Sequence, residues 1–157
     1  MIAIIQRVNH AEVTVDGKSV GKCGKGLLIL LGVASGDTYA DADAIIKKIP
    51  SLRIFTDADD KMNLSLNDIG GEILAISNFT LLANCRRGNR PDYMGAEKPE
   101  AASRMYDYFV DKLRESVTHV ATGIFGADMK IDTQNDGPVT IILDSNALRA
   151  PRSGGVS

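Results

Sequence analysis

The chain of 157 residues has few of the residues that build metal centres and disulfide frameworks. It contains no tryptophan and only two cysteines, Cys23 and Cys85. Neither cysteine stands in a CxxC motif, and the sequence has no HxxxH or HExxH motif. Cytosolic thiols are normally reduced, so we interpret both cysteines as structural or incidental. We therefore predict no metal and no cofactor.

Long apolar runs and a large net charge are also missing. The longest apolar run, residues 27–31, is far too short to span a membrane, and the apolar start at 1–5 lacks the basic residues of a signal peptide. A formal net charge of −2 excludes nucleic-acid binding through overall positive charge, but it allows a local basic patch. We expect a cytoplasmic protein without membrane association.

What is present is the composition of one soluble domain, with 44% apolar and 24% charged residues. Alternating or continuous apolar segments predict strands at 1–9, 11–15, 18–23, 27–33, 52–55, 72–79, 117–124, 129–134 and 139–144. Asp16-Gly17 predicts a hairpin turn. Two helices are predicted, one capped by Asp37 and ended by Pro50, the other over 100–115. The fold class is mixed α/β and strand-rich, mostly antiparallel, in one domain over 1–145 with a flexible tail over 146–157.

Side chains suited to catalysis are scarce. His10 and His119 each stand alone, and no nucleophile-elbow pattern flanks a serine. The carboxylates at 37–43 and 57–60 fit a helix start and a surface turn, because the second group lacks the order of a calcium loop. An ester hydrolase with a histidine base remains an alternative, in which replacing His10 or His119 would abolish activity.

Three segments carry weaker signals. Arg86, Arg87 and Arg90 form a basic stretch in a loop, which either binds phosphates or is simply solvated. Residues 77–80 (Ser-Asn-Phe-Thr) end a buried strand, where small hydroxyls either line a pocket or cap a turn. Residues 137–140 (Gly-Pro-Val-Thr) open the last strand, and a Gly-Pro pair there can direct backbone carbonyls at a partner.

In their order and spacing, these segments resemble the D-aminoacyl-tRNA deacylase family over essentially the whole chain to Leu143. The matching motifs are 4–8 (IIQRV), 26–32, 77–81 (SNFTL), 86–91, 123–129 (GIFGADM) and 135–140 (NDGPVT). The resemblance implies layered β-sheets with helices, in a β/β/α architecture. It also implies hydrolysis of the ester that joins a D-amino acid to the tRNA 3′ adenosine, which is chiral proofreading in translation.

The family pattern implies a role for each matching residue. The predicted catalytic residues are Ser77, Phe79 and Thr80, and the predicted substrate-binding residues are Asn78, Phe125, Met129, Gly137 and Pro138. Members of the family are homodimers, and a cis Gly-Pro pair of each subunit inserts into the pocket of its partner. The carbonyl oxygens of this pair reject L-aminoacyl groups. Arg7 would help to hold that segment, and Arg86, Arg87 and Arg90 would contact tRNA phosphates.

The resemblance also explains the missing base. In the family the adenosine 2′-hydroxyl is thought to help activate water, and backbone N–H groups near Phe79 and Thr80 would stabilise the oxyanion. Glycyl-tRNA mischarged on tRNA-Ala is a second substrate that the family implies. One departure is Asn78, where the family usually has Gln, one methylene longer. It favours the alternative of a module that binds the tRNA 3′ end or a nucleotide without turnover.

Overall fold

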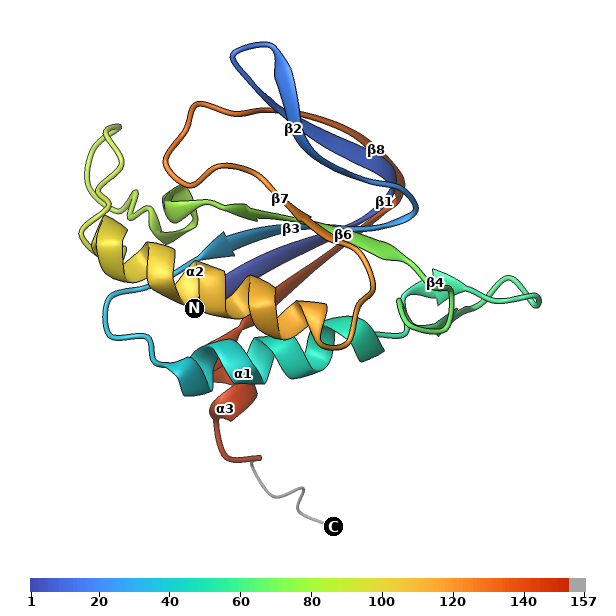
Figure 1. Cartoon of the computed structure of the whole chain (residues 1–157). Helices are drawn as coiled ribbons and strands as arrows, with labels where there is room; N and C mark the ends of the chain where they lie inside the picture. The colour runs from blue at the N-terminus through green and yellow to red at the C-terminus, as the bar shows by residue number, and fades with distance from the viewer. Residues whose placement is uncertain (153–157) are drawn as a thin grey trace.

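A curved sheet carries the helices on one of its faces, as Figure 1 shows for the computed structural model, which describes residues 1–152. The strands are β1 (Ile2–Val15), β2 (Lys18–Cys23), β3 (Gly26–Gly32), β4 (Phe55–Thr56), β5 (Met62–Leu64), β6 (Glu72–Ser77), β7 (Val120–Thr122) and β8 (Lys130–Asp144). The helices are α1 (Tyr39–Lys48), α2 (Pro99–Arg114) and α3 (Ser145–Arg149), with 3₁₀ turns η1 (Ile49–Ser51) and η2 (Phe79–Leu82).

The main sheet has the order β2-β1-β3-β6-β7, and β8 pairs with β1. Strand β1 is antiparallel to β2, β3 and β8, whereas β3–β6 and β6–β7 are parallel pairs. Strand β3 is buried on both faces apart from half-buried Leu30, which explains its continuous apolar sequence. The hairpin predicted at Asp16-Gly17 is confirmed, since both residues have positive φ between β1 and β2.

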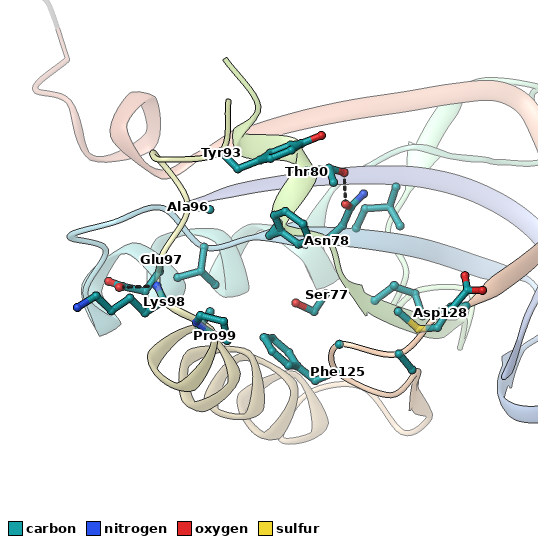
Figure 2. A pocket seen from close by; sticks show the side chains of 18 of the residues that line it. Ser77, Asn78, Thr80, Tyr93, Ala96, Glu97, Lys98, Pro99, Phe125 and Asp128 are labelled. Carbon is teal, nitrogen blue, oxygen red and sulfur yellow. Dashed lines mark hydrogen bonds between the residues drawn. The ribbon is translucent and has the colours of Figure 1, made fainter. Parts of the chain in front are cut away.

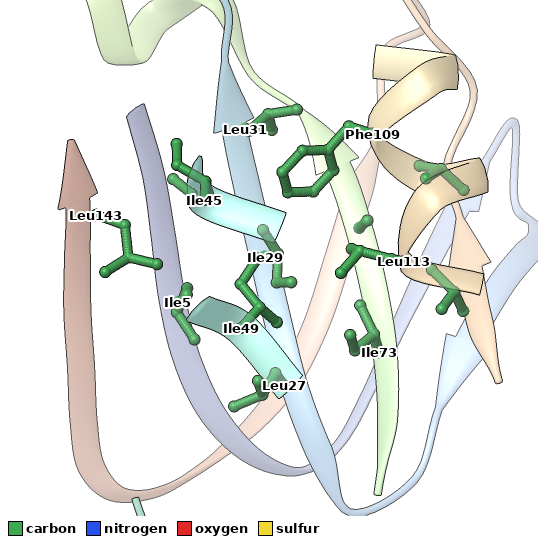
Figure 3. Close-up of a cluster of buried hydrophobic side chains, with 14 of the residues drawn as sticks. Ile5, Leu27, Ile29, Leu31, Ile45, Ile49, Ile73, Phe109, Leu113 and Leu143 are labelled. Atoms are coloured by element: carbon green, nitrogen blue, oxygen red, sulfur yellow. The ribbon is translucent and has the colours of Figure 1, made fainter. Parts of the chain in front are cut away.

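Side chains on opposite faces of the sheet enter two separate cores. Leu27, Ile29 and Leu31 of β3 point toward α1 and α2, where they meet Ile45 and Phe109 (Figure 3). The other face of β3 and β6 packs under the folded-over ends of β1 and β2, in a cluster of Val8, Ala11, Val13, Cys23, Leu28, Leu74 and Ile76. This β/β/α layering confirms the predicted architecture.

Close packing of β2 on β7 completes the second layer. A Cβ at Gly21 would collide with the carbonyl of Thr122, so only glycine allows the two strands to approach this closely. Burial raises the pKa of the Cys23 thiol in this layer to about 11, which keeps it protonated at neutral pH. Cys85 is exposed, and both cysteines are free thiols.

Several predicted elements differ from the structure. The strands predicted at 129–134 and 139–144 are one strand, β8, because its partner β1 is continuous and pairs with both segments. The strand predicted at 117–124 is only three residues long, and that at 52–55 is reduced to β4. Thr38, and not Asp37, is the N-cap of α1.

The predicted tail from residue 146 also differs from the structure. Residues 146–149 belong to a third helix, α3, and Arg149 forms an ion pair with Asp41 of α1 at 2.8 Å. Only two helices were expected, because five residues show too little periodicity to be recognised as a helix. Residues 153–157 of the predicted tail lie outside the described residues. None of the helices in residues 1–152 is both long enough and apolar enough to cross a membrane.

Candidate functional site

A cavity of about 840 Å³ opens where β6 ends, between η2, the start of α2 and the segment that leads into β8 (Figure 2). Its walls are mainly apolar, with Leu30 and Ile76 from the sheet, Val33 directly after β3 and Ala102 from α2. The size and the apolar lining are those of a small-molecule site.

Six of the predicted site residues line this cavity although they come from two distant segments. They are Ser77, Asn78, Phe79 and Thr80 from the end of β6 and η2, and Phe125 and Met129 from the segment before β8. The parallel pairing of β6 with β3 and β7 brings the segments together. Asn78 extends the β3–β6 ladder by donating its N–H to the Leu31 carbonyl at 2.8 Å.

The backbone changes direction directly after Asn78. Phe79 and Thr80 are the first residues of η2, and the first N–H groups of a helical turn have no partner within it. The N–H of Asn78 is already used in the sheet, so it is not available to a substrate. Of this segment, the N–H groups of Phe79 and Thr80 are therefore the ones without a backbone partner among the described residues, and they are available to a ligand.

The side chains of Asn78 and Thr80 contact each other at this rim. The Thr80 hydroxyl donates to the Asn78 Oδ1 at 2.5 Å (Figure 2). The amide of Asn78 is thus engaged within its own motif. This bond directs the Thr80 proton toward an amide oxygen, which is no general base.

Both histidines lie elsewhere in the part of the chain that the structure describes. His10 is exposed on β1, and His119 contacts the carbonyl of Lys22 through Nε2 at 2.9 Å beside the start of β6, at the opposite end of that strand from the cavity. The ionisable side chains in the cavity wall are instead Tyr93, Glu97, Lys98 and Asp128. This arrangement disfavours the alternative of a histidine base.

The apolar floor is built by close packing. A Cβ at Gly123 would lie 2.5 Å from the Met129 Sδ, so Gly123 leaves the space that seats Met129. Behind Phe125, the Tyr106 ring lies at a centroid distance of 6.3 Å, and its hydroxyl donates to the Ala75 carbonyl at 2.7 Å. Burial raises the pKa of Tyr106 to about 12, so this phenol stays protonated at neutral pH. It therefore keeps its hydrogen bond to β6 behind the cavity.

Gly137 and Pro138 do not line the cavity of their own chain. Their peptide bond is cis, and both residues are exposed on β8. In the pairing of β1 with β8, Gln6 lies opposite Thr140 and Val8 opposite Asn135, so residues 136–139 bulge out opposite Arg7 alone.

Arg7 contacts the first residue of this bulge. Its Nε donates to the Asp136 carbonyl at 3.0 Å and lies 3.2 Å from the Asp136 carboxylate. Its Nη1 donates to the buried Ile54 carbonyl at 2.8 Å. Arg7 thus contacts the residue just before Gly137. These contacts support the predicted role of Arg7 in holding the Gly-Pro segment.

The basic loop extends from the rim of the cavity. Asn84 and Asp92 close its base with two backbone hydrogen bonds of 2.7 and 3.0 Å, and Arg86, Arg87 and Arg90 are exposed at its tip. Sequence reasoning missed Tyr93, Glu97, Lys98 and Asp128 as lining residues. Asp128 belongs to the 123–129 motif and could have been found there, whereas the other three had no local signal.

Comparison with known proteins finds similarity to D-aminoacyl-tRNA deacylases over most of the chain. The family model described as D-Tyr-tRNA(Tyr) deacylase matches residues 4–144. The chain is 57% identical to a D-aminoacyl-tRNA deacylase of Persephonella marina over 94% of this chain and 100% of the relative. It is 55% identical to a D-aminoacyl-tRNA deacylase of Thermosipho melanesiensis, over 94% and 99%.

Two solved structures share the fold. One is titled c-Myc DNA Unwinding Element Binding Protein, with a TM-score of 0.87 and 39% identity over 92% of this chain and 98% of the other. The second is titled as a probable eukaryotic D-amino acid tRNA deacylase, with a TM-score of 0.76 over 91% and 98%. At 16% identity, the second likeness concerns the fold alone.

Proposed function

The chain belongs to the D-Tyr-tRNA(Tyr) deacylase family, and from that membership we infer that it hydrolyses the ester bond of D-aminoacyl-tRNA. The products are the free D-amino acid and tRNA, so the enzyme removes D-amino acids before they enter translation. The observation that carries this inference is the cavity that joins the 77–80 and 123–129 motifs, which lie far apart in the sequence. We expect this work to take place in the cytoplasm, where tRNA is charged.

The cavity suits a reaction that needs little side-chain chemistry. An aminoacyl ester is already activated, so stabilising the oxyanion of the tetrahedral intermediate is the main requirement. The N–H groups of Phe79 and Thr80 at the start of η2 would donate to that oxygen. Water attacks the carbonyl carbon with help from the adenosine 2′-hydroxyl, and the 3′-oxygen leaves with a proton. Ser77 and Asn78 would position the terminal adenosine, and Phe125 and Met129 the aminoacyl group.

Gly137 and Pro138 would act as a chirality filter in a second copy of the chain. Support comes from their exposure, from the bulge that carries them, and from their absence from the lining of their own cavity. Placed over a partner's cavity, their carbonyl oxygens would repel an L-aminoacyl side chain and leave room for the hydrogen of a D-substrate. The enzyme would therefore be a homodimer.

An uncovered apolar row supports such a dimer. Ile4 of β1 lies opposite both Leu30 of β3 and Ile142 of β8, so the three side chains share the sheet face away from α1 and α2. Ile142 is 68% exposed, and Leu30 also lines the cavity. A partner seated on this row would bury apolar surface next to the site and bring its own β8 close to it.

Turnover of charged tRNA tests the function. We expect the protein to release D-tyrosine from D-Tyr-tRNA and to leave L-Tyr-tRNA intact. A module that only binds the tRNA 3′ end, the alternative that Asn78 favours, would instead protect the D-ester from spontaneous hydrolysis. Glycyl-tRNA carries no side chain for the filter to reject, so we expect it to be cleaved as well.

Replacement of Gly137 tests the filter. Gly137 has φ +132°, and a Cβ there would lie 2.7 Å from the Val139 nitrogen, so Gly137→Ala must shift the bulge. We expect a loss of the ratio of D- to L-Tyr-tRNA cleavage. Gly36→Ala is the matched control, because Gly36 also has positive φ but a Cβ there meets no atom within 4 Å. An unchanged ratio in a folded Gly137→Ala protein would refute the filter.

A further inference from the structure

Two exposed aromatic rings stand at the mouth of the cavity. Phe79 is 57% and Tyr93 is 39% exposed, and their rings meet edge to face with centroids 5.2 Å apart. They come from different elements, because Phe79 belongs to η2. Tyr93, which Figure 2 labels, belongs to the loop that leads to α2. Aromatic side chains this exposed at the rim of a site indicate a surface that binds something.

The loop between these rings is strongly basic. The backbone bond pair of Asn84 and Asp92 folds it into a projecting tip, and Tyr93 follows directly after that closure. Arg86, Arg87 and Arg90 at the tip are exposed, and none of them forms an ion pair with another described residue. In a chain with net charge −2, this is a local concentration of positive charge beside an aromatic pair.

Aromatic rings next to arginines fit one class of ligand, unpaired nucleotides. Single-stranded nucleic acid is bound by stacking of bases on aromatic side chains and by basic groups that follow the phosphates. An uncharged protein segment or a neutral lipid surface would use the apolar rings but has no matching need for three unpaired guanidinium groups. The rings lie at the exit of the cavity, where a polynucleotide attached to a bound terminal adenosine must leave.

We propose that Tyr93, supported by Phe79, stacks a base of the unpaired nucleotides that precede the terminal adenosine of tRNA, while Arg86, Arg87 and Arg90 bind their phosphates. This surface rests on the proposed function, since it extends the site that holds the ester. It makes Tyr93 a positioning residue for the polynucleotide part of the substrate, which lies outside the reacting atoms.

The test compares two substrates that share the same ester. One is D-tyrosine esterified to adenosine, and the other is D-tyrosine esterified to the trinucleotide CCA. Base stacking on an aromatic side chain contributes about 1–3 kcal/mol, so Tyr93→Ala should lower kcat/KM for the trinucleotide ester by roughly 5- to 150-fold. The adenosine ester should lose far less, and Tyr93→Phe should restore the trinucleotide rate.

Met94→Ala is the matched control for the aromatic position. Met94 is the next residue, is 88% exposed and does not line the cavity, so its removal should leave both substrates unaffected. Equal losses on both esters with Tyr93→Ala would show that Tyr93 only shapes the cavity, and no loss on either would show that it binds nothing. Both results would overturn the proposal.

The arginines are tested through salt dependence. Binding of uncharged CCA-ended tRNA should weaken with salt, and each arginine that contacts a phosphate contributes about 0.7 to the logarithmic slope. Arg86→Ala, Arg87→Ala and Arg90→Ala should each reduce the slope by about that amount. Lys47→Ala removes one exposed charge from α1 and should not. Three unchanged slopes would contradict the assignment of the loop.

The proposed hydrolysis and the proposed stacking surface can fail separately. If the wild-type protein cleaves neither ester, the proposed function fails. If it cleaves both esters, and Tyr93→Ala changes neither their ratio nor the binding of uncharged tRNA, only the stacking surface fails. Binding of uncharged tRNA involves no ester, so it reports on the surface without turnover.

Discussion

At the scale of single residues, the structure around the site depends on side chains that donate hydrogen bonds to backbone carbonyls. Arg7 is the clearest case, because its guanidinium spans two carbonyls from segments far apart in sequence, at Ile54 and Asp136. A guanidinium has five N–H donors in a planar fork, whereas an ammonium is a single point of charge. The position therefore depends on arginine and not merely on positive charge.

Arg7→Lys should lower the free energy of unfolding by about 1–3 kcal/mol, because one buried carbonyl would lose its donor. The ratio of D- to L-Tyr-tRNA cleavage should fall as well, since the bulge that carries Gly137 loses its support. Urea unfolding and deacylation assays measure the two effects. Arg53→Lys is the control, because Arg53 donates to the Asn63 carbonyl at an exposed site and should change stability by less than about 0.5 kcal/mol. Equal effects of both substitutions would contradict the bridging role.

Thr80 is the side chain most easily mistaken for a nucleophile. Its hydroxyl donates to Asn78 Oδ1, and no histidine lines the cavity within residues 1–152. The carboxylates in the cavity wall have other partners, since Glu97 accepts from the Lys98 N–H and Asp128 from Lys130. Thr80→Ala should therefore keep substantial deacylation of D-Tyr-tRNA, with a loss within about tenfold from the freed Asn78 amide. Thr80→Ser, which keeps the hydroxyl, should be closer to wild type. Complete inactivity of a folded Thr80→Ala protein would restore Thr80 as the nucleophile.

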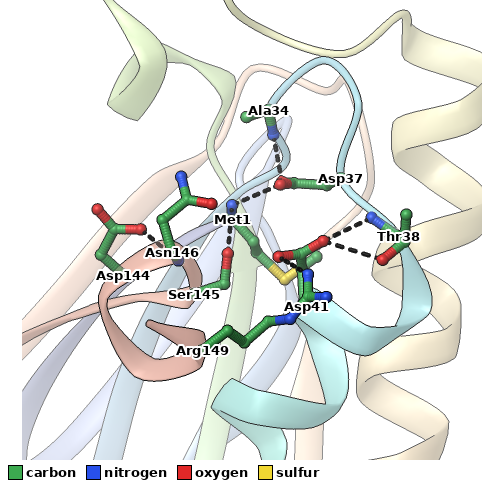
Figure 4. A network of polar contacts seen from close by, with 9 residues as sticks. All are labelled: Met1, Ala34, Asp37, Thr38, Asp41, Asp144, Ser145, Asn146 and Arg149. Atoms are coloured by element: carbon green, nitrogen blue, oxygen red, sulfur yellow. Dashed lines mark hydrogen bonds and ion pairs between the residues drawn. The ribbon is translucent and has the colours of Figure 1, made fainter. Parts of the chain in front are cut away.

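At the scale of elements, a polar network joins the start of α1 to α3 and to the first strand (Figure 4). The Met1 ammonium donates to Asp37 at 2.7 Å and to the Ser145 hydroxyl at 3.0 Å. Asp41 accepts from the N–H and hydroxyl of Thr38 and pairs with Arg149. The network fixes the end of β8 against the helix layer, which explains why residues 146–149 are ordered.

Asp41 makes this network sensitive to pH. Burial alone would raise the pKa of its carboxyl, but the hydrogen bonds from Thr38 and Arg149 outweigh burial and hold the pKa well below its usual value. A depressed pKa stabilises the fold above the unfolded-state value near 4, and this stabilisation is lost as the pH falls through the folded-state value.

Asp41→Asn should cost about 1–3 kcal/mol of unfolding free energy at pH 7, because the capping box of α1 loses its carboxylate and Arg149 loses its partner. The difference from wild type should shrink as the pH falls below about 4, where protonation begins to weaken the wild-type network. Urea titrations at pH 7 and pH 3 measure both values. Asp43→Asn on the same helix is the control, since Asn can still accept from the Tyr108 hydroxyl. A difference that grows toward acid would contradict this assignment.

At the scale of the whole molecule, the second sheet layer covers only part of the face away from the helices. It buries the cluster around Leu28 and Leu74 but leaves the row of Ile4, Leu30 and Ile142 beside the cavity. A homodimer that covers the remainder would explain an apolar strand face next to a site.

Ile142→Lys should convert the proposed dimer to a monomer with little change in monomer stability, because Ile142 makes few contacts within its own chain. Light scattering during size-exclusion chromatography gives the mass of each species. Discrimination between D- and L-Tyr-tRNA should disappear together with the dimer. Met62→Lys, at a 59% exposed residue of β5, is the control and should remain dimeric. A dimeric Ile142→Lys protein would place the interface on another surface.

Local sequence patterns predicted the elements whose periodicity is strong. The helix over 100–115 is confirmed as α2 within one residue at each end, and the strand at 18–23 matches β2. Both have their own turn or cap signals and one buried face. The sequence predicted two strands on either side of Gly137, because Gly and Pro favour a break in a strand. In the structure β1 pairs with residues on both sides of the bulge, so the two segments form one strand.

The sequence by itself determined the family, the apolar strands and the motif residues, because these are local patterns in a fixed order. Tertiary structure alone decided which of them meet. Parallel pairing of β6 with β3 and β7 puts Ser77 and Met129 in one cavity, and a bulge held by Arg7 turns Gly137 and Pro138 away from it. Such contacts depend on long-range strand pairing and on packing on both faces of a sheet, and no short window of sequence contains either.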